Sequence, residues 1–260
     1  MNASSTAPDL ASLLYGSPAA AAGNPVTALQ NAVKNQTTGV AQEAKQPEVA
    51  RDIAAFRKAV ANAKDAKTLL ADPVARKVLL TANGLGDQTD YAALATKALT
   101  SDTTKSDSLA SKLSNKQWLT AAKTFDFANQ GLSVLKKSSV LDTITNGYAE
   151  VKWRQSLDQT TPGLSNALDF RTRASTITSA YQILGDATFR DVVTTALGIP
   201  KEIAYQSLDA QAKAITDHVD ITKFKSSNFV EQFTRRYLVA KATDTSTQSS
   251  TTTQNSGLLV

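Results

Sequence analysis

The chain has 260 residues, no cysteine, one histidine and a formal net charge of +5. A chain without cysteine has neither disulfide bonds nor thiolate metal sites, and the absence of an 18-residue apolar run predicts no membrane-spanning helix. Lysine and arginine are interleaved with aspartate and glutamate, whereas nucleic-acid binding needs a concentrated basic stripe. We therefore predict a mixed, solvated surface and no nucleic-acid partner.

Residues 1–46 are predicted to be largely disordered. The first 24 are rich in Ala, Ser, Gly and Pro and contain few large apolar side chains that would offset the entropy of ordering. They lack the basic and apolar regions of a signal peptide, so we expect no conventional secretion, and export machines that read unfolded N-termini stay an alternative. From Pro25 a short helix is predicted, with Val26, Leu29 and Val33 on a thin apolar face. We expect it to dock weakly on the core or to order only with a partner.

The folded part is predicted to begin with a helix from Pro47 to Leu70, because apolar residues recur there every three or four positions. Asp72 followed by Pro73 is a strong helix start. Gly84 lies where a left-handed C-terminal residue is favoured. These signals predict a second helix from Val74 to Asn83.

Part of this segment occurs twice. A shift of 114 positions places residues 56–84 over residues 170–198 without a gap, and ten of the 29 positions are identical. Such self-similarity indicates one supersecondary unit used twice, each copy burying apolar surface that the other cannot bury alone. The identical pairs are Phe56/Phe170, Arg57/Arg171, Ala66/Ala180, Leu70/Leu184, Asp72/Asp186, Arg76/Arg190, Val78/Val192, Thr81/Thr195, Ala82/Ala196 and Gly84/Gly198.

Beyond the identical stretch, a Tyr, a Leu and an Ala at matched positions are predicted to form the inward face of the next helix. They are Tyr91, Leu94 and Ala98 in the first copy, and Tyr205, Leu208 and Ala212 in the second. Aromatic residues at helical spacing are predicted to anchor the last helix of each copy in the core rather than to stack on bases. They are Trp118 and Phe125 in the first copy, and Phe229, Phe233 and Tyr237 in the second.

Residues 128–169 have no counterpart in this alignment. Their apolar spacing predicts a helix N-capped by Ser138 or Ser139, followed by a break at Thr161-Pro162-Gly163. We expect this insert to join the two copies and to cover part of their shared core.

Arg76 and Arg190 each lie four residues after a predicted N-cap. We interpret them as a repeated capping or interhelix ion-pair residue rather than as a paired anion site. His218, between Asp217 and Asp220, is interpreted as a surface cap at a helix end, because a lone histidine lacks the second ligand or nucleophile that a site requires.

Other candidate sites fail on their surroundings. The carboxylate pairs Asp87/Asp90 and Asp217/Asp220 lie outside any oxygen-rich, glycine-containing calcium loop. The stretch Gly84–Gly86 follows a helix rather than a strand and has no Lys-Ser/Thr sequel, so we reject a phosphate loop. We predict no catalytic, cofactor-binding or metal-binding residue, no cofactor and no enzymatic activity. Acidic residues that meet only in the fold are the enzymatic alternative.

The predicted fold is all-α, with two pseudo-repeated multi-helix units packed around one core into one helical domain and disordered ends. The domain covers residues 47–240, with copies at about 56–127 and 170–240 joined by the insert 128–169. The polar Ser/Thr/Gln tract 241–260 is predicted to be a disordered tail. The short apolar segment at its end, Gly257–Val260, is either a peptide ligand, a chaperone signal or a segment without a role.

Two stretches carry a family resemblance. Similarity to the first half of the bacterial family known as domain of unknown function 1217 is carried by FRKAVANAKDAKTLLADPVARKVLLTANGL, KALTSD and LASKLSNKQW. Similarity to its second half is carried by AYQILGDATFRDVVTTALGIPKEIAYQSLDAQAKAI and FVEQFTRRYL. The resemblance covers roughly residues 50–240 and includes the pattern L-x-D-x-x-x-R-x-V with a closing Ala-x-Gly.

Members of that family occur mainly in flagellated proteobacteria, often beside genes for flagellar rod, hook and filament parts. The resemblance implies a structural or assembly protein that contacts flagellar components and is located in the flagellum or exported by the flagellar route. The alternative is a cytosolic helical adaptor or export chaperone with a partner groove between the two copies. An enzyme that uses acidic residues is the third hypothesis.

Overall fold

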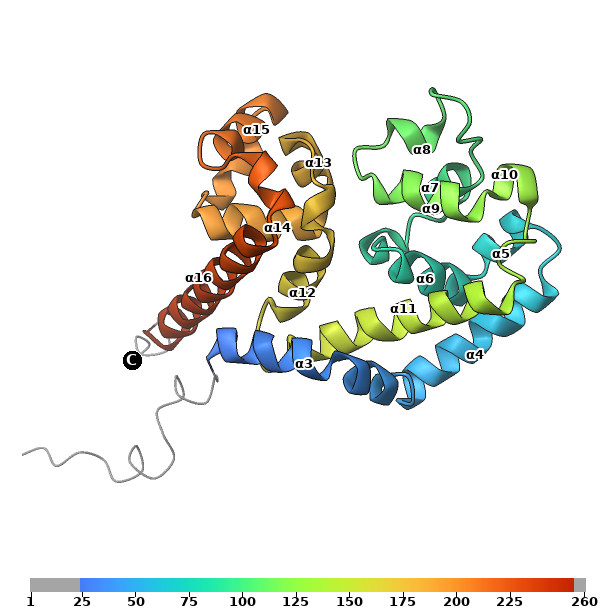
Figure 1. The fold of residues 1–260 in the computed structure, drawn as a ribbon, viewed down its shortest axis with the longest axis horizontal. Helices are drawn as coiled ribbons and strands as arrows, with labels where there is room; N and C mark the ends of the chain where they lie inside the picture. Colours follow the sequence, from blue (N-terminus) through green and yellow to red (C-terminus); the bar gives the residue numbers. More distant parts are fainter. Residues whose placement is uncertain (1–23, 255–260) are drawn as a thin grey trace, which may run out of the picture.

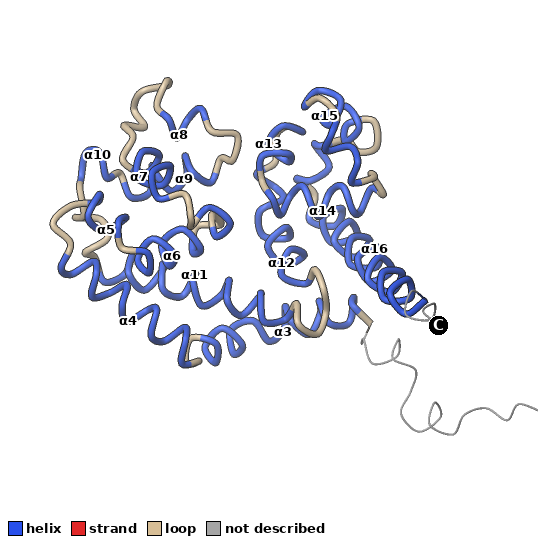
Figure 2. Tube along the Cα trace, turned by 180° about the vertical axis from the view of Figure 1, so that it is seen from behind, coloured by secondary structure: helices blue, strands red, loops and turns tan. Residues whose placement is uncertain are grey.

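The computed structural model describes residues 24–254, and this range contains α-helices and short 3-10 helices but no β-strand (Figures 1 and 2). The all-α prediction is thereby confirmed. No helix in this range is both long and apolar enough to cross a lipid bilayer. Residues 1–23 and 255–260, which belong to the predicted disordered ends, lie outside the described residues.

The helices form two units that stand side by side, with α3 (Pro25–Glu43) and α11 along one edge of the molecule (Figure 1). The first unit contains α4 (Pro47–Asn62), α5 (Ala66–Ala71), α6 (Pro73–Ala82), α7 (Ala92–Leu99), α8 (Leu109–Lys112), α9 (Gln117–Phe125), α10 (Phe127–Gln130) and α11 (Ser138–Leu157). The second unit contains α12 (Leu164–Arg173), α13 (Ala180–Gly185), α14 (Ala187–Leu197), α15 (Leu208–Thr216) and α16 (Ser227–Gln254). The 3-10 helices are η1 (Gly86–Gln88), η2 (Ala174–Thr176), η3 (Lys201–Tyr205) and η4 (Ile221–Lys225).

Each unit has its own apolar core, whereas one core shared by both units was predicted from the sequence. Phe56 and Trp118 belong to the first cluster, and Phe170 belongs to the second. Helix α11 contributes to both, because Tyr148 lies in the first cluster and Trp153 in the second. The second cluster also includes Leu29 and Ala32 of α3, and the two cores are separate clusters that α11 joins.

The predicted starts of α6 and α14 are confirmed. Asp72 Oδ1 accepts two backbone N–H bonds at the start of α6, at 2.9 and 2.8 Å, and Asp186 Oδ1 accepts one of 3.0 Å at the start of α14. The chain leaves both helices through a left-handed glycine, Gly84 with φ 72° and Gly198 with φ 69°. These conformations suit glycine because it has no Cβ.

The two matched arginines cap helices. Arg76 Nη1 donates to the carbonyl oxygen of Leu70, and Arg190 Nη1 donates to that of Leu184, both at 2.8 Å. These carbonyls lie at the ends of α5 and α13, where the helix leaves them without a partner of its own. The capping interpretation of the two arginines is confirmed.

Two helix starts differ from the prediction. The single helix expected to reach Leu70 is divided into α4 and α5, because the Asp65 side chain accepts a 2.7 Å bond from the backbone N of Thr68 and begins a new helix. Helix α11 begins at Ser138, but its N-cap is Lys137 and no side-chain capping bond is formed there. The predicted serine cap is therefore wrong.

The inward face predicted after each repeat is wrong at three positions. Tyr91, Tyr205 and Leu208 are 59%, 90% and 55% exposed. Tyr91 precedes α7 and Tyr205 ends η3, so neither lies within the helix whose face it was expected to join. The predicted alanines, Ala98 and Ala212, are buried.

Both ends of the described chain are more helical than expected. Helix α3 packs against α11, α12 and α16 and buries Leu29 and Ala32. Its approach to α11 is close, since a Cβ added to Gly39 would lie 2.3 Å from Trp153 Nε1. Helix α16 continues beyond Lys241 to Gln254, where the sequence predicted the start of a tail.

Candidate functional site

A buried carboxylate holds three helices of the first unit together. Asp52 on α4 accepts two hydrogen bonds at Oδ2, one of 2.7 Å from Lys77 Nζ on α6 and one of 2.6 Å from the Tyr148 hydroxyl on α11. Asp52 is 5% exposed and Tyr148 is fully buried. An ionised group at this depth is stable only with such partners.

The second unit has a carboxylate in a similar setting. Asp191 on α14 accepts a 2.6 Å bond from the Tyr237 hydroxyl and a 2.9 Å bond from Lys241 Nζ, both on α16. Asn166 Nδ2 on α12 donates a third bond of 2.8 Å. The carboxylate therefore ties α12, α14 and α16 together.

The two networks use matched positions with the charged groups exchanged. The shift of 114 residues relates Asp52 to Asn166 and Lys77 to Asp191. The carboxylate consequently lies on α4 in the first unit and on α14, the counterpart of α6, in the second. Matched positions therefore take part in both networks, with different assignments of charge.

Helices α11 and α16 are related by another shift, of 89 residues. The matched pairs are Asp142/Glu231, Thr145/Thr234, Tyr148/Tyr237 and Lys152/Lys241. Arg57 pairs with Asp142 at 2.6 Å, and its counterpart Arg171 pairs with Glu231 at 2.8 Å. The insert predicted to lack a counterpart therefore contains the closing helix of the first unit. That the two units superimpose as wholes stays a prediction.

Burial and hydrogen bonding shift the pKa values of these groups, in opposite directions for the carboxylates and in the same direction for the phenols. Burial raises the pKa of the Asp52 carboxyl, but the bonds from Lys77 and Tyr148 outweigh burial and leave its pKa below the ordinary value. The pKa of Asp191 is also lowered, because bonds from its three partners outweigh burial. Burial, reinforced by the bond to the carboxylate, raises the pKa of both Tyr148 and Tyr237. At neutral pH the phenols are therefore donors and the carboxylates are ionised acceptors.

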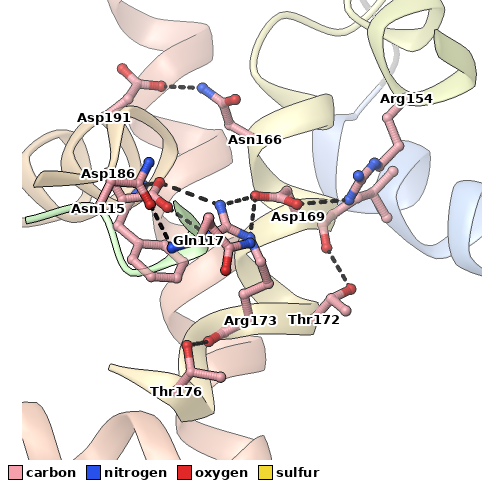
Figure 3. A network of polar contacts seen from close by, with 12 residues as sticks. Asn115, Gln117, Arg154, Asn166, Asp169, Thr172, Arg173, Thr176, Asp186 and Asp191 are labelled. Carbon is pink, nitrogen blue, oxygen red and sulfur yellow. Dashed lines mark hydrogen bonds and ion pairs between the residues drawn. The ribbon is translucent and has the colours of Figure 1, made fainter. Parts of the chain in front are cut away.

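A chain of ion pairs lies where the two units meet (Figure 3). Arg154 Nη1 on α11 pairs with Asp169 Oδ1 on α12 at 3.0 Å. Arg173 pairs with the same Asp169 and, at 2.6 Å, with Asp186, the N-cap of α14. The Arg173 guanidinium also lies 4.3 Å from the centre of the Phe189 ring. These charges neutralise one another along the seam.

A polar cavity of about 260 Å³ adjoins these ion pairs. Residues of both units line it, among them Thr81, Asn115 and Asn166. Arg154 also lines it, and the Nε atom of this arginine is buried without a hydrogen-bond partner among the described residues. The cavity lies between the two units, where a partner groove was expected from the sequence, and binding of a partner there stays a prediction.

A second hollow, here called the α14–α16 groove, has a volume of about 770 Å³ and lies in the second unit between α14, η3 and α16. Leu184, Ile199, Ile203 and Ala240 give it apolar walls. Four charged residues also line it, two basic and two acidic: Arg190, Lys201, Asp191 and Asp244. The groove is large enough for several side chains of another segment.

Three large apolar side chains are exposed on adjoining elements of the second unit. Tyr205 is 90%, Leu208 55% and Tyr181 49% exposed, and we call these three residues the apolar tip. The Tyr181 hydroxyl donates a 2.8 Å bond to Asp209, which ties α13 to α15, and η3, which ends at Tyr205, also contacts α15. Sequence reasoning missed both the groove and the tip. The sequence feature that indicates them is the apolar turn IPKEIAY after Gly198, where the first copy has the polar turn LGDQTDY.

The residues singled out in the sequence lie at the surface. His218 Nδ1 is 2.8 Å from the carbonyl oxygen of Ala214 at the end of α15, so the predicted surface cap is confirmed. Asp87 and Asp90 are exposed. Asp217 accepts from Lys213 at 2.7 Å, and Asp220 caps the start of η4. In the part of the chain that the structure describes, no three His, Asp or Glu side chains lie close enough to hold a metal ion.

The fold and these surfaces define an all-α protein of two joined helical units with an apolar groove and tip on one of them. Residues 82–230 match the family described as Protein of unknown function (DUF1217), and since this is more than half of the chain, the chain belongs to that family. The fold is similar to a crystal structure of protein AGR_C_984 from Agrobacterium tumefaciens, with a TM-score of 0.68 and 24% sequence identity. The similarity covers 82% of this chain and 91% of that one. No curated protein matches the sequence.

Proposed function

We propose that this protein is a non-enzymatic structural or assembly protein of the bacterial flagellum and acts through contacts with flagellar proteins. The observation that carries the proposal is the apolar tip, three large side chains left exposed on the adjoining elements α13, η3 and α15. Exposed apolar groups of this kind favour a protein interface. The flagellar part of the proposal rests on the family, whose members occur beside flagellar genes.

The tip has features of an interface anchor. Tyrosine offers a large contact area with few rotatable bonds, and it is enriched among residues that dominate binding energy. Tyr181 is held by its bond to Asp209 and so loses little further freedom when a partner binds. Tyr205 protrudes and has most of its ring available for contact.

The test is complementation of a deletion strain of the bacterium that carries the gene. A Tyr205→Asp/Leu208→Asp variant should fail to restore swimming and should be lost from the sheared-flagella fraction. Tyr91→Asp is the matched control, because Tyr91 is the exposed counterpart of Tyr205 in the first unit, and it should restore both. Normal swimming and normal flagella in the deletion strain itself would refute the proposal.

A cytosolic adaptor or export chaperone is the second candidate, and the polar cavity between the units is the feature that favours it. The same fractionation distinguishes the two candidates. Detection of the protein outside the cell by a route that depends on flagellar export would exclude the cytosolic adaptor.

A further inference from the structure

The α14–α16 groove occupies a place that is closed in the first unit. There, Arg76 Nε donates a 2.8 Å bond to the carbonyl oxygen of Thr89, which holds the following loop against α6. The matched residues of the second unit are Arg190 and Ile203, and both line the open groove. The turn after α6 in the first unit is polar and bonded to Arg76, whereas the matched turn after α14 in the second unit is apolar and lines an open groove.

An apolar space of this size favours an apolar occupant. A water molecule has about 30 Å³ of liquid volume, so about 770 Å³ corresponds to many waters placed against apolar walls. Replacing such water by apolar side chains is favourable. The groove is therefore suited to a short segment with several large apolar residues.

This chain contains such a segment close to the groove. Helix α3 begins at Pro25 and packs against α16, so the first described residues of the chain lie beside α16 (Figure 1). Ala240 and Asp244 of the same α16 line the groove. The preceding sequence includes DLASLLY, residues 9–15, in which Leu10, Leu13 and Leu14 are spaced to share one face of a helical turn.

The connection is long enough. Eight residues lie between Tyr15 and Asn24, and the nine extended steps from Tyr15 to Asn24 span about 30 Å. A helix with its side chains is about 10–12 Å across, so the connection can pass over α16 and enter the groove. The acidic Asp9 precedes the leucines, and Lys201 on the groove wall is a suitable partner for its carboxylate.

We propose that the α14–α16 groove is the docking site of residues 10–15 of the same chain. The contact is intramolecular and buries the leucines of this segment against Ile199, Ile203 and Ala240. It does not depend on the proposed flagellar function, because it is a property of the isolated full-length protein.

The absence of native cysteine allows a direct test. Ser12→Cys is combined with Ala204→Cys, an exposed residue of the groove wall, and the full-length protein is treated with a short bis-maleimide. We expect a crosslinked product of monomer mass that joins these two positions. Adding Leu13→Asp and Leu14→Asp should lower its yield at least about tenfold, because each buried leucine contributes about that factor to docking.

Two variants control for charge and for folding. Ala20→Asp/Ala21→Asp adds the same charge to the connection and should leave the crosslink yield unchanged. Ile203→Thr places the first unit's residue type at the matched position of the groove and should lower the yield while leaving the thermal unfolding midpoint of the protein near that of the parent.

Three outcomes would overturn the proposal. Equal yields with and without the leucine substitutions would mean that the two thiols meet only by random motion. A product of dimer mass that increases with protein concentration would assign the groove to a second copy. Crosslinking of Leu259→Cys, but not of Ser12→Cys, to Ala204→Cys would assign it to the C-terminal tip.

Discussion

Tyr148 and Tyr237 stand 89 residues apart at matched positions of α11 and α16, and each donates a 2.6 Å hydrogen bond to an aspartate on a neighbouring helix. Both rings are fully buried. Their acceptors, Asp52 and Asp191, are not matched to each other. The tyrosine is therefore the constant part of the two networks, around which the acidic and basic positions differ.

Tyr148→Phe and Tyr237→Phe should each lower the free energy of unfolding by about 1.5–3 kcal/mol, since each removes a hydrogen bond to a charged acceptor. Denaturant unfolding of the purified variants measures this. Tyr181→Phe is the control, because its hydroxyl bonds Asp209 at the surface, and it should change stability by less than about 0.5 kcal/mol. A large loss at only one buried tyrosine would show that the networks differ in strength.

Exchanging the charges of the first network should reproduce the second. Asp52→Asn alone leaves Lys77 and Tyr148 without their carboxylate, and Lys77→Asp alone places two carboxylates together. The double variant has an amide on α4 and a carboxylate on α6, as Asn166 and Asp191 provide in the second unit. Lys152 on α11, which pairs with Glu48 at 3.8 Å, matches Lys241.

We expect the double variant to be more stable than the sum of the single effects predicts, by about 0.5–3 kcal/mol. A double-mutant cycle in denaturant gives this coupling energy. Additive effects would contradict the equivalence of the two networks.

The local features of the fold could be predicted, because they depend on residues close in sequence. Asp72 caps amides two and three residues ahead, and Gly84 ends the same helix through its own backbone. The match between α11 and α16 escaped the gap-free alignment, because the first unit has α8, α9 and α10 after α7 whereas the second has η4 after α15. Only the spaced identities such as Thr145/Thr234 remain.

The α14–α16 groove could not be predicted, because it depends on where a loop lies relative to a helix some forty residues further along the chain. Ile203 lines it, and this residue differs in polarity from its counterpart Thr89. That difference indicates an exposed apolar turn. It does not indicate that Ala240 of α16 faces the same space.

Leu70→Ala and Leu184→Ala test the two cores separately. Both leucines are buried, so each substitution should cost on the order of 2–5 kcal/mol. Leu184 also lines the groove, where the structure can relax, and we expect its loss to be the smaller. Denaturant unfolding measures both, and a near-neutral Leu70→Ala would contradict the buried core of the first unit.

Gly163 and Gly198 both have positive φ, 84° and 69°, but their surroundings differ. A Cβ at Gly198 meets no atom within 4 Å, so Gly198→Ala should cost only the backbone strain of about 1–2 kcal/mol. A Cβ at Gly163 would lie 2.7 Å from the Tyr237 hydroxyl, which is fixed by Asp191. Gly163→Ala should therefore destabilise the protein more than Gly198→Ala, and equal losses in thermal unfolding would show that Tyr237 moves freely.

Because the pKa of Asp191 is lowered in the folded protein, part of the free energy of unfolding depends on pH. The contribution is fully present above the unfolded pKa of about 3.9 and is lost as the pH falls through the lower folded pKa. The difference in unfolding free energy between the wild type and Asp191→Asn should therefore stay constant from about pH 7 to 5 and shrink below about pH 4.

Asp158 supplies a control of opposite sign, because burial raises its pKa. Its ionised form is disfavoured in the folded protein, so the wild type should gain stability relative to Asp158→Asn as acid protonates the carboxyl. Denaturant unfolding at a series of pH values measures both differences. Curves that run parallel for the two variants would show that Asp191 and Asp158 do not differ in environment, and the carboxylate network of the second unit would then contribute nothing specific to acid stability.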